Sequence, residues 1–222
     1  MLYADNPRTK KFVAEDLDVF TALATYAAVA IEQSRMSDQL LQETKRRERL
    51  QRYHSPSVVS RILGAEGTGI GTPFLAQERD LTIMFCDLVS FTTLCENMAP
   101  AQVAHLLNQF FTKMAEDIFE LEGTLDKFMG DAILAVFGAP FPQPDHADRA
   151  VQAALAMRAS LAAMNAEPGA RQLSMRIAIH SGRATTGDIG SPRRREFTVL
   201  GDVVNTTSRL ESSVAKPGMI VI

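Results

Sequence analysis

The stretch LDKFMGDAILAVFG, from Leu125 to Gly138, contains two β-type runs that meet at Gly130 and Asp131. Two such runs separated by a glycine and an acid predict short strands joined as a β-hairpin. Aspartate is a common turn residue, so from this stretch alone a structural turn is the simpler interpretation of Asp131. A chemical role for Asp131 therefore depends on what the rest of the chain places beside it.

The composition is that of a globular protein. The chain has 222 residues, of which 46% are hydrophobic, and this suffices for one ordinary domain plus an appendage. Its net charge of -3 argues against binding nucleic acid through bulk positive charge. Cys86 and Cys95 have neither a CxxC nor a zinc spacing, so we expect a reduced, cytoplasmic setting and no catalytic cysteine.

No membrane span or signal peptide is recognised in the sequence. The longest run of apolar or small residues near the start, around Ala22 to Ile31, is far shorter than the roughly 20 residues that a span needs. A membrane tether in sequence outside this chain is left open.

The amino-terminal region has apolar residues that step alternately by four and three: Val13, Leu17, Phe20, Ala24, Ala27 and Ile31. This spacing puts them on one stripe of a helix and favours a coiled coil with a partner helix. The charged run KRRERLQR, Lys45 to Arg52, is typical of a solvated helix face. The glycine-rich segment from Gly64 to Phe74 has no periodic apolar pattern, so we place the linker there.

After the linker, strands and helices alternate. The pattern predicts, in order, a buried strand Leu81–Cys86, an amphipathic helix from Pro100 to Gly123, the strand pair around Gly130, a helix His146–Asn165, a strand Leu173–His180, its hairpin partner EFTVLG, a helix VVNTTSRLESS and a last strand MIVI. The order β-α-β-β-α-β followed by β-α-β is that of a ferredoxin-like α+β palm with an extension. The predicted fold class is therefore α+β, preceded by a long coiled-coil helix.

Asp87 ends the first buried strand, 44 residues before Asp131 (131 minus 87). In the ferredoxin-like topology these two strands are neighbours, so both carboxylates are expected at one edge of the sheet. Two such acids repel unless a cation lies between them, and magnesium typically uses one or two carboxylates together with substrate phosphates. The four histidines have no paired spacing, which makes a zinc site the weaker interpretation. Backbone amides from Val89 to Thr92, at a predicted helix start, are candidates for holding phosphate oxygens.

Four stretches in succession resemble the motifs of class III nucleotidyl cyclases: MFCDLVSFT, LDKFMGDAILAVFG, RIAIHSGRATTGDIG and REFTVLGDVVNTTSRL. The resemblance runs from about Arg79 to the last residue. It implies that Asp87 and Asp131, with the carbonyl of Leu88, hold two Mg²⁺ or Mn²⁺ ions against a nucleoside triphosphate. It also implies substrate contacts from Phe91 and Thr92.

The resemblance implies roles for five further residues. Arg183 matches an arginine that binds phosphate. Asn205 matches a residue that orients the ribose, and Arg209 matches one that stabilises charge on the α-phosphate; they are four apart on the predicted helix and so share a face. Lys127 and Thr198 match the positions that read the purine, and these residue types favour adenine over guanine.

These implied roles give an adenylyl cyclase that makes cyclic AMP and pyrophosphate from ATP. Threonine at this position marks a subgroup of the family, some members of which respond to bicarbonate. The resemblance implies that Lys127, Thr198, Asn205 and Arg209 of one site come from one subunit and that Asp87, Asp131 and Arg183 come from the other, so a homodimer is expected.

The amino-terminal region resembles parts that precede such domains. FVAEDLDVFTALATYAAVAIEQ resembles the closing helix of a GAF sensor domain, and RRERLQRYHSPSVVSRIL resembles a segment joining a coil to the catalytic domain. The expected boundaries are 1–45 for the sensor end and signalling helix, 46–78 for the transducer and linker, and 79–222 for the catalytic domain. The family domain normally continues with a helix and a hairpin, so part of it is expected beyond this sequence.

Three alternatives stay open at this point. A GGDEF-type diguanylate cyclase shares the palm fold and the use of acidic residues to bind metal ions, but the chain has no GG[DE]EF motif. A guanylyl cyclase would need a different purine contact from Lys127 and Thr198. A non-enzymatic dimerising module with a degenerate cyclase domain is disfavoured because all the matched positions hold suitable residues.

Overall fold

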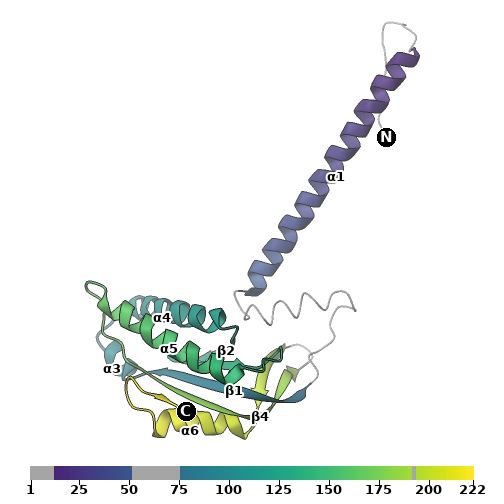
Figure 1. The fold of residues 1–222 in the computed structure, drawn as a ribbon. Helices are drawn as coiled ribbons and strands as arrows, with labels where there is room; N and C mark the ends of the chain where they lie inside the picture. The colour runs from purple at the N-terminus through teal and green to yellow at the C-terminus, as the bar shows by residue number, and fades with distance from the viewer. Residues whose placement is uncertain (1–12, 52–75, 192–193) are drawn as a thin grey trace. The chain divides into compact units, whose positions relative to one another are not determined.

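The computed structural model describes residues 13–51, 76–191 and 194–222, and the chain divides into two compact units, Met1–Leu50 and Gln51–Ile222. The first unit contains the helix α1 (Ala14–Gln51) (Figure 1). The amide of Val13 donates to Asp16 Oδ2 over 2.9 Å at the start of this helix. The long predicted helix is confirmed, whereas the predicted linker lies outside the described residues.

The predicted apolar stripe lies on the surface of α1. Val13, Leu17 and Ile31 are 58%, 65% and 56% exposed, whereas Phe20, Ala24 and Ala27 are half-buried. Apolar side chains along a helix that are this exposed are typical of a surface that packs against another chain or domain.

The second unit is built on one sheet. Its elements are β1 (Gln77–Leu88), α3 (Phe91–Cys95), α4 (Pro100–Glu120), β2 (Thr124–Met129), β3 (Ala132–Phe137), α5 (His146–Ala166), β4 (Met175–Ser191), β5 (Arg194–Leu200), α6 (Asp202–Ser213) and β6 (Ile220–Val221). The strand order is β2-β3-β1-β4-β5, and β6 pairs in parallel with β4. The run β4-β1-β3-β2 confirms the ferredoxin-like palm, and the hairpin between β2 and β3 is also confirmed.

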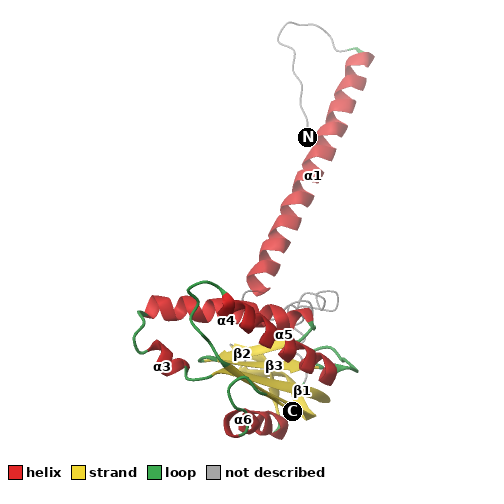
Figure 2. Ribbon diagram, turned by 60° about the vertical axis from the view of Figure 1, so that its left-hand side comes forward, coloured by secondary structure: helices red, strands yellow, loops and turns green. Residues whose placement is uncertain are grey.

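Helices cover both faces of this sheet, with α4 and α5 on one face and α6 on the other (Figure 2). The alternation of side chains along β1 divides the core accordingly. Met84 and Cys86 pack in the cluster formed with α4 and α5, whereas Ile83 and Phe85 pack in the cluster that includes Val203 of α6. Because side chains alternate along a strand, Asp87 belongs to the α6 face.

Strand β4 is longer than predicted. The sequence pattern gave Leu173–His180, but β4 spans Met175–Ser191, pairs with β1 and continues into a hairpin with β5. Polar residues interrupt the apolar pattern in the second half of β4. In that half the side chains of Ala184 and Thr186 are buried, whereas that of Arg183 is exposed. The hairpin across the basic tip is confirmed.

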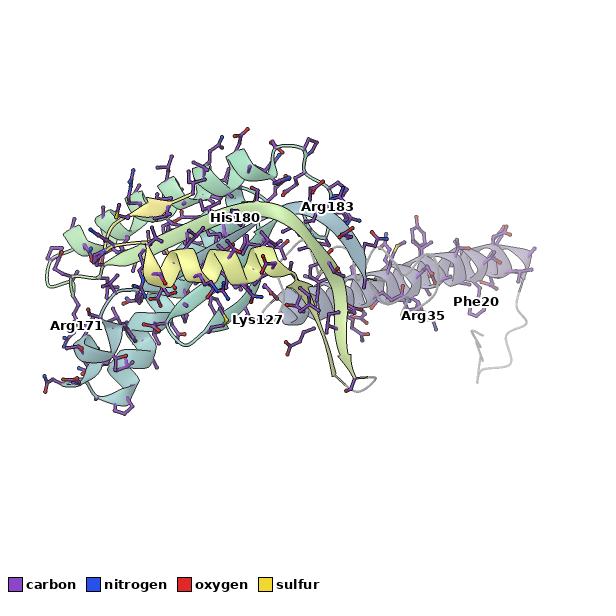
Figure 3. The ribbon with its side chains drawn as sticks, turned by 90° about the horizontal axis from the view of Figure 1, so that it is seen from below. Phe20, Arg35, Lys127, Arg171, His180 and Arg183 are labelled. Carbon is purple, nitrogen blue, oxygen red and sulfur yellow. The ribbon has the colours of Figure 1, made fainter. Side chains whose placement is uncertain are left out.

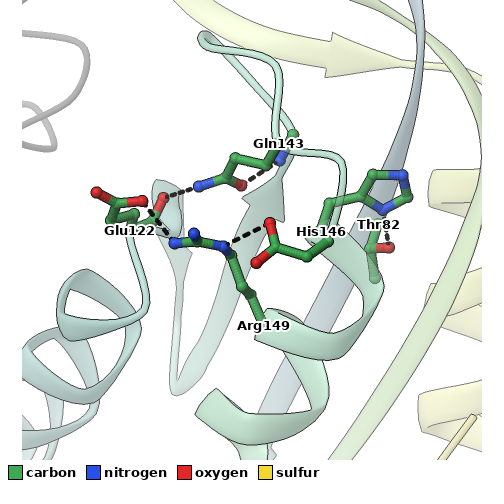
Figure 4. Close-up of polar contacts among 7 residues, drawn as sticks. Thr82, Glu122, Gln143, His146 and Arg149 are labelled. Carbon is green, nitrogen blue, oxygen red and sulfur yellow. Dashed lines mark hydrogen bonds and ion pairs between the residues drawn. The ribbon is translucent and has the colours of Figure 1, made fainter.

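A polar network fixes the loop between β3 and α5 (Figure 4). The Gly138 amide donates to Gln143 Oε1 over 2.7 Å, and Gln143 Nε2 donates to the carbonyl of Glu122 over 3.0 Å. Arg149, in the first turn of α5, pairs with Asp145 and Glu122. The loop is therefore tied both to its own helix and to the end of α4.

Both cysteines are free thiols, Cys86 in the core and Cys95 half-buried. Burial raises the pKa of the Cys86 thiol well above its usual range, with the charge of Asp87 adding to the shift, so it is not a thiolate nucleophile. No helix in the described part of the chain is long and apolar enough to cross a membrane.

Candidate active site

The two aspartates singled out by the sequence meet at one edge of the sheet. In the antiparallel pairing of β1 with β3, Asp87 lies opposite Ala132, the neighbour of Asp131. Gly130 has a φ of 68° and supplies the left-handed turn conformation directly before Asp131. The pKa of the Asp131 carboxyl is raised, chiefly by burial and in part by the negative charge of Asp87. The negative charge of Asp87 thus disfavours the ionised form of Asp131, and a cation between the two carboxylates would oppose that effect.

Two further charges, which the sequence reasoning missed, complete this cluster. Arg176 of β4 lies opposite Asp87 in the sheet, and its guanidinium donates to Asp87 Oδ2 over 2.8 Å. The same guanidinium forms an ion pair with Glu211 of α6. The pKa of Glu211 is raised, chiefly by burial and then by the charge of Asp87. The available sequence signal was a charge, Arg176, inside the apolar run of a central strand.

The segment after β1 was predicted to offer amides to phosphate, and this is wrong for one residue. The Val89 amide donates to the carbonyl of Ser174 over 2.8 Å and so is already used. Ser90 precedes α3 in a left-handed conformation, with φ 57°. The Phe91 side chain is buried and that of Thr92 is exposed, so at Phe91 only the backbone is placed to meet a ligand. The side chain of Leu88 is likewise buried, which leaves its carbonyl as the only candidate ligand atom.

The two purine-reading candidates come together around a third residue. Thr198 of β5 donates a hydrogen bond from Oγ1 to Asp126 Oδ2 over 2.8 Å. Lys127 Nζ lies 3.9 Å from Asp126 Oδ1 and 3.7 Å from Glu196 Oε2. Burial raises the pKa of Asp126, and the hydrogen bond from Thr198 acts against that shift. Sequence reasoning selected Lys127 and Thr198 but gave Asp126 no role.

Asn205 and Arg209 lie on α6, one turn apart, and both side chains are exposed. Glu211 is on the same helix but buried against the sheet. Since successive helical residues are about 100° apart, Arg209 and Glu211 point in nearly opposite directions. The helix thus presents one face to the acidic cluster of its own chain and another outward.

Arg183 does not join the acidic pair within one chain. It lies on β4 opposite Asp80, seven positions along the strand from Arg176 (183 minus 176), which faces Asp87. The side chain is 72% exposed and forms ion pairs with Glu78 and Asp80 at 3.9 and 3.6 Å. Figure 3 shows it on the long curved strand with His180. Its phosphate-binding role stays a prediction.

Comparison with known proteins identifies the domain that carries these residues. The family model described as the adenylate and guanylate cyclase catalytic domain matches residues 75–222. The chain belongs to this family. The match begins just before β1 and includes both aspartates of the cyclase domain, the Lys127 and Thr198 pair, and helix α6.

Relatives of this cyclase domain include enzymes named for adenylate cyclase activity. The chain is 35% identical to "Adenylate cyclase 1" of Rhizobium meliloti (strain 1021) over 139 residues, which are 61% of this chain and 21% of that protein. It is 33% identical to "Adenylate cyclase" of Anabaena cylindrica over 166 residues, or 72% of this chain and 32% of that protein. The chain therefore spans only about a fifth to a third of the length of these curated relatives.

Solved structures similar to this cyclase domain include both substrate classes. The guanylyl cyclase Cya2 is 40% identical with a TM-score of 0.62, covering 65% of this chain and 75% of that one. The adenylyl cyclase CyaB from P. aeruginosa is 33% identical with a TM-score of 0.60, covering 65% and 76%. The similarity establishes a nucleotide cyclase domain, and the choice between ATP and GTP rests on the residues themselves.

The residues of this cyclase domain fit a divalent cation that takes part of its ligands from the substrate. Within the described ranges, no group of three or more His, Cys, Asp or Glu side chains is arranged to hold a metal. The chain instead offers two carboxylates, Asp87 and Asp131, whose charges disfavour each other. Magnesium commonly uses this donor set, with phosphates and water as the remaining ligands.

Proposed function

We propose that the domain converts ATP to 3',5'-cyclic AMP and pyrophosphate. The observation that carries this choice of substrate is the placing of Lys127 and Thr198 around one carboxylate, Asp126, in a cyclase domain with an acidic pair. A lysine ammonium donates to adenine N1, which is an acceptor, whereas N1 of guanine carries a hydrogen. A threonine hydroxyl is able to accept from the 6-amino group of adenine.

The proposed chemistry is an in-line displacement at the α-phosphate. The ribose 3'-hydroxyl gives its proton to water, its oxygen forms a bond to the α-phosphorus, and the bond from that phosphorus to the oxygen bridging to the β-phosphate breaks, which releases pyrophosphate. Asp87, Asp131 and the Leu88 carbonyl would hold two Mg²⁺ or Mn²⁺ ions, which when bound acidify the 3'-hydroxyl and neutralise the phosphates. Asn205 orients the ribose, and Arg209 stabilises charge that develops on the α-phosphate. The amides of Phe91 and Thr92 bind phosphate oxygens. Arg183 receives no contact in this proposal, because it lies seven residues along β4 from Arg176, the pairing partner of Asp87.

We propose that each site lies between two copies of the chain. The two faces of α6 support this: Glu211 is directed to the acidic cluster of its own chain, while Asn205 and Arg209 are exposed and free to serve another chain's substrate. Lys127 is also 37% exposed. A monomer would then hold the metal ligands of one half-site and the purine and transition-state contacts of another.

The exposed stripe of α1 fits a parallel coiled coil that pairs the same two copies. We propose that α1 continues from a GAF-like sensor and sets the relative angle of the two catalytic domains. Leu17→Asp with Ile31→Asp should convert the dimer to monomer in sedimentation analysis and reduce turnover by about tenfold or more, since both half-sites would separate. Loss of the dimer with full activity would contradict this assignment. Two free thiols and an ATP substrate favour a cytoplasmic location.

Turnover of ATP and GTP, with Mn²⁺ or Mg²⁺, tests the proposed function. Wild type is compared with Asp87→Ala, and Asp148→Ala serves as the matched control because Asp148 is an exposed aspartate on α5, remote in sequence from every proposed ligand. We expect ATP turnover that Asp87→Ala abolishes and Asp148→Ala leaves within about twofold of wild type.

Other results would select the alternatives. Preferential turnover of GTP would make the domain a guanylyl cyclase and overturn the roles of Lys127 and Thr198. No turnover of either nucleotide by a stable dimer that includes the complete carboxyl end of the family domain would favour a non-enzymatic dimerising module.

A further inference from the structure

Asp126 occupies an irregular position in the sheet. The pairing of β2 with β3 matches Leu125 to Ala135 and then Lys127 to Leu134, so Asp126 is the extra residue of a β-bulge. Bulges commonly redirect a side chain. Here the side chain reaches Thr198 on β5, although β2 and β5 stand at opposite ends of the strand order.

The Asp126 carboxylate is almost completely buried, with only 2% of its side chain exposed. Its Oδ2 accepts from Thr198, but its Oδ1 has no hydrogen-bond donor among the described residues. Lys127 Nζ, at 3.9 Å, is close enough for electrostatic attraction but too far for a hydrogen bond. A buried carboxylate with one unsatisfied oxygen costs stability, so a fold-stabilising tie alone does not account for it.

We propose that Asp126 sets the hydrogen-bonding direction of Thr198 and thereby selects the 6-amino group of adenine. This inference rests on the proposed function and deepens it. A hydroxyl has one proton and two acceptor lone pairs, whereas an ionised carboxylate only accepts. Thr198 must therefore donate to Asp126, and what it presents to a purine is an acceptor.

That polarity discriminates between purines. An amino group at position 6 donates to the Thr198 oxygen, but an oxo group would place two acceptors against each other and leave both unpaired. Sites that leave a polar group unpaired with the wrong substrate discriminate strongly, and for one partly exposed contact we expect about 10- to 100-fold. Asp126 is a positioning residue here, since it acts through Thr198 and does not touch the base.

Because burial raises the pKa of Asp126, the test measures kcat/KM for three triphosphates at about pH 8, which favours the ionised carboxylate. ATP has the 6-amino group, and purine riboside triphosphate lacks only that group. Inosine triphosphate has an oxo group in its place and also a hydrogen on N1, so its comparison with ATP includes the Lys127 contact, which is the same in every variant. Wild type should prefer ATP to both. Asp126→Asn keeps the size of the side chain but allows an amide donor to face Thr198, so the hydroxyl is free to turn its proton to the base. The ATP to inosine triphosphate ratio should then fall by about tenfold or more.

Two comparisons isolate the hydroxyl. Thr198→Val should lose the preference for ATP over purine riboside triphosphate, whereas Thr198→Ser should keep it, and this pair tests the inference even if Asp126→Asn fails to fold. The double variant Asp126→Asn with Thr198→Val should change the ratio no further than Thr198→Val alone, since both act through one hydroxyl. Glu196→Gln removes a negative charge beside Lys127 but keeps both partners of the Thr198 to Asp126 hydrogen bond, and it should leave the ratio within about twofold of wild type.

Each contrary result is distinct. If Asp126→Asn keeps the wild-type ratio, or lowers turnover of all three nucleotides in parallel, Asp126 has only a structural role and the inference is overturned while the proposed function stands. The same holds if Glu196→Gln reproduces the effect, because charge beside Lys127 would then be the cause. A wild type that turns over none of the three overturns the proposed function and this inference with it.

Discussion

Arg176 is the cation on which the acidic cluster depends before any metal binds. It donates to Asp87 and pairs with Glu211, whose side chains are 18% and 10% exposed. Arg176→Met keeps much of the aliphatic stem but leaves both carboxylates without a counter-charge. Breaking a fully buried pair costs about 3–5 kcal/mol, and the partial exposure of these groups reduces the expected loss to about 2–3 kcal/mol. For a domain of this size that loss lowers the melting temperature by about 4–12 °C.

Circular dichroism melts of the full chain, which has no tryptophan, are the assay. Arg158→Met is the matched control, since Arg158 is exposed on α5, and it should change stability by less than about 0.5 kcal/mol. Adding Glu211→Gln to Arg176→Met should recover part of the loss by removing one of the two uncompensated charges. If Arg176→Met melts within about 2 °C of wild type, or if Glu211→Gln makes it worse, the electrostatic account of the cluster is wrong.

Two further substitutions test the ionisation of Asp131 and the packing at Gly123. The pKa of Asp131 is raised in the folded state, so the folded chain binds this proton more readily than the unfolded chain, and the stability contributed by Asp131 is lost as pH rises through its folded pKa. Asp131→Asn should therefore raise the melting temperature at neutral pH by about 1–3 °C and abolish turnover. The difference in melting temperature from wild type should shrink as pH falls towards 4. An equal difference at every pH would contradict the raised pKa of Asp131. Gly123→Ala should cost about 1–3 kcal/mol in a denaturant titration, because a Cβ there would lie 2.7 Å from atoms of both Ile118 and Phe137; unchanged stability would show that this contact relaxes freely.

The arrangement of the sheet could be predicted because its strands carry local signals. The apolar run before Asp87 and the paired runs around Gly130 each specify a strand, and the ferredoxin-like order then fixes which strands are neighbours. The second half of β4 could not be predicted this way, because its polar residues do not form an apolar run. Pairing with β1 on one side and β5 on the other holds it in the sheet.

A residue of the candidate site could be predicted only where its type and its place in the local sequence pattern already indicate its role. Asp87 and Asp131 attract attention as acids at strand ends, but the ion pair of Arg176 with Asp87 joins residues 89 apart and depends on strand register. Asp126 is similar, because its hydrogen bond to Thr198 joins residues 72 apart through a bulge that no local pattern marks. The occupied Val89 amide also depends on a distant strand.

Complementation between two inactive variants tests the central proposal most directly. Asp87→Ala removes a metal ligand of one half-site, and Asn205→Ala removes a ribose contact of the other. If each site is shared between two chains, co-expression of the two variants should restore ATP turnover to about a quarter of wild type, because half of the dimers are mixed and one of their two sites is intact. Turnover of the mixture no higher than that of either variant alone, with mixed dimers present, would contradict a site shared between two chains.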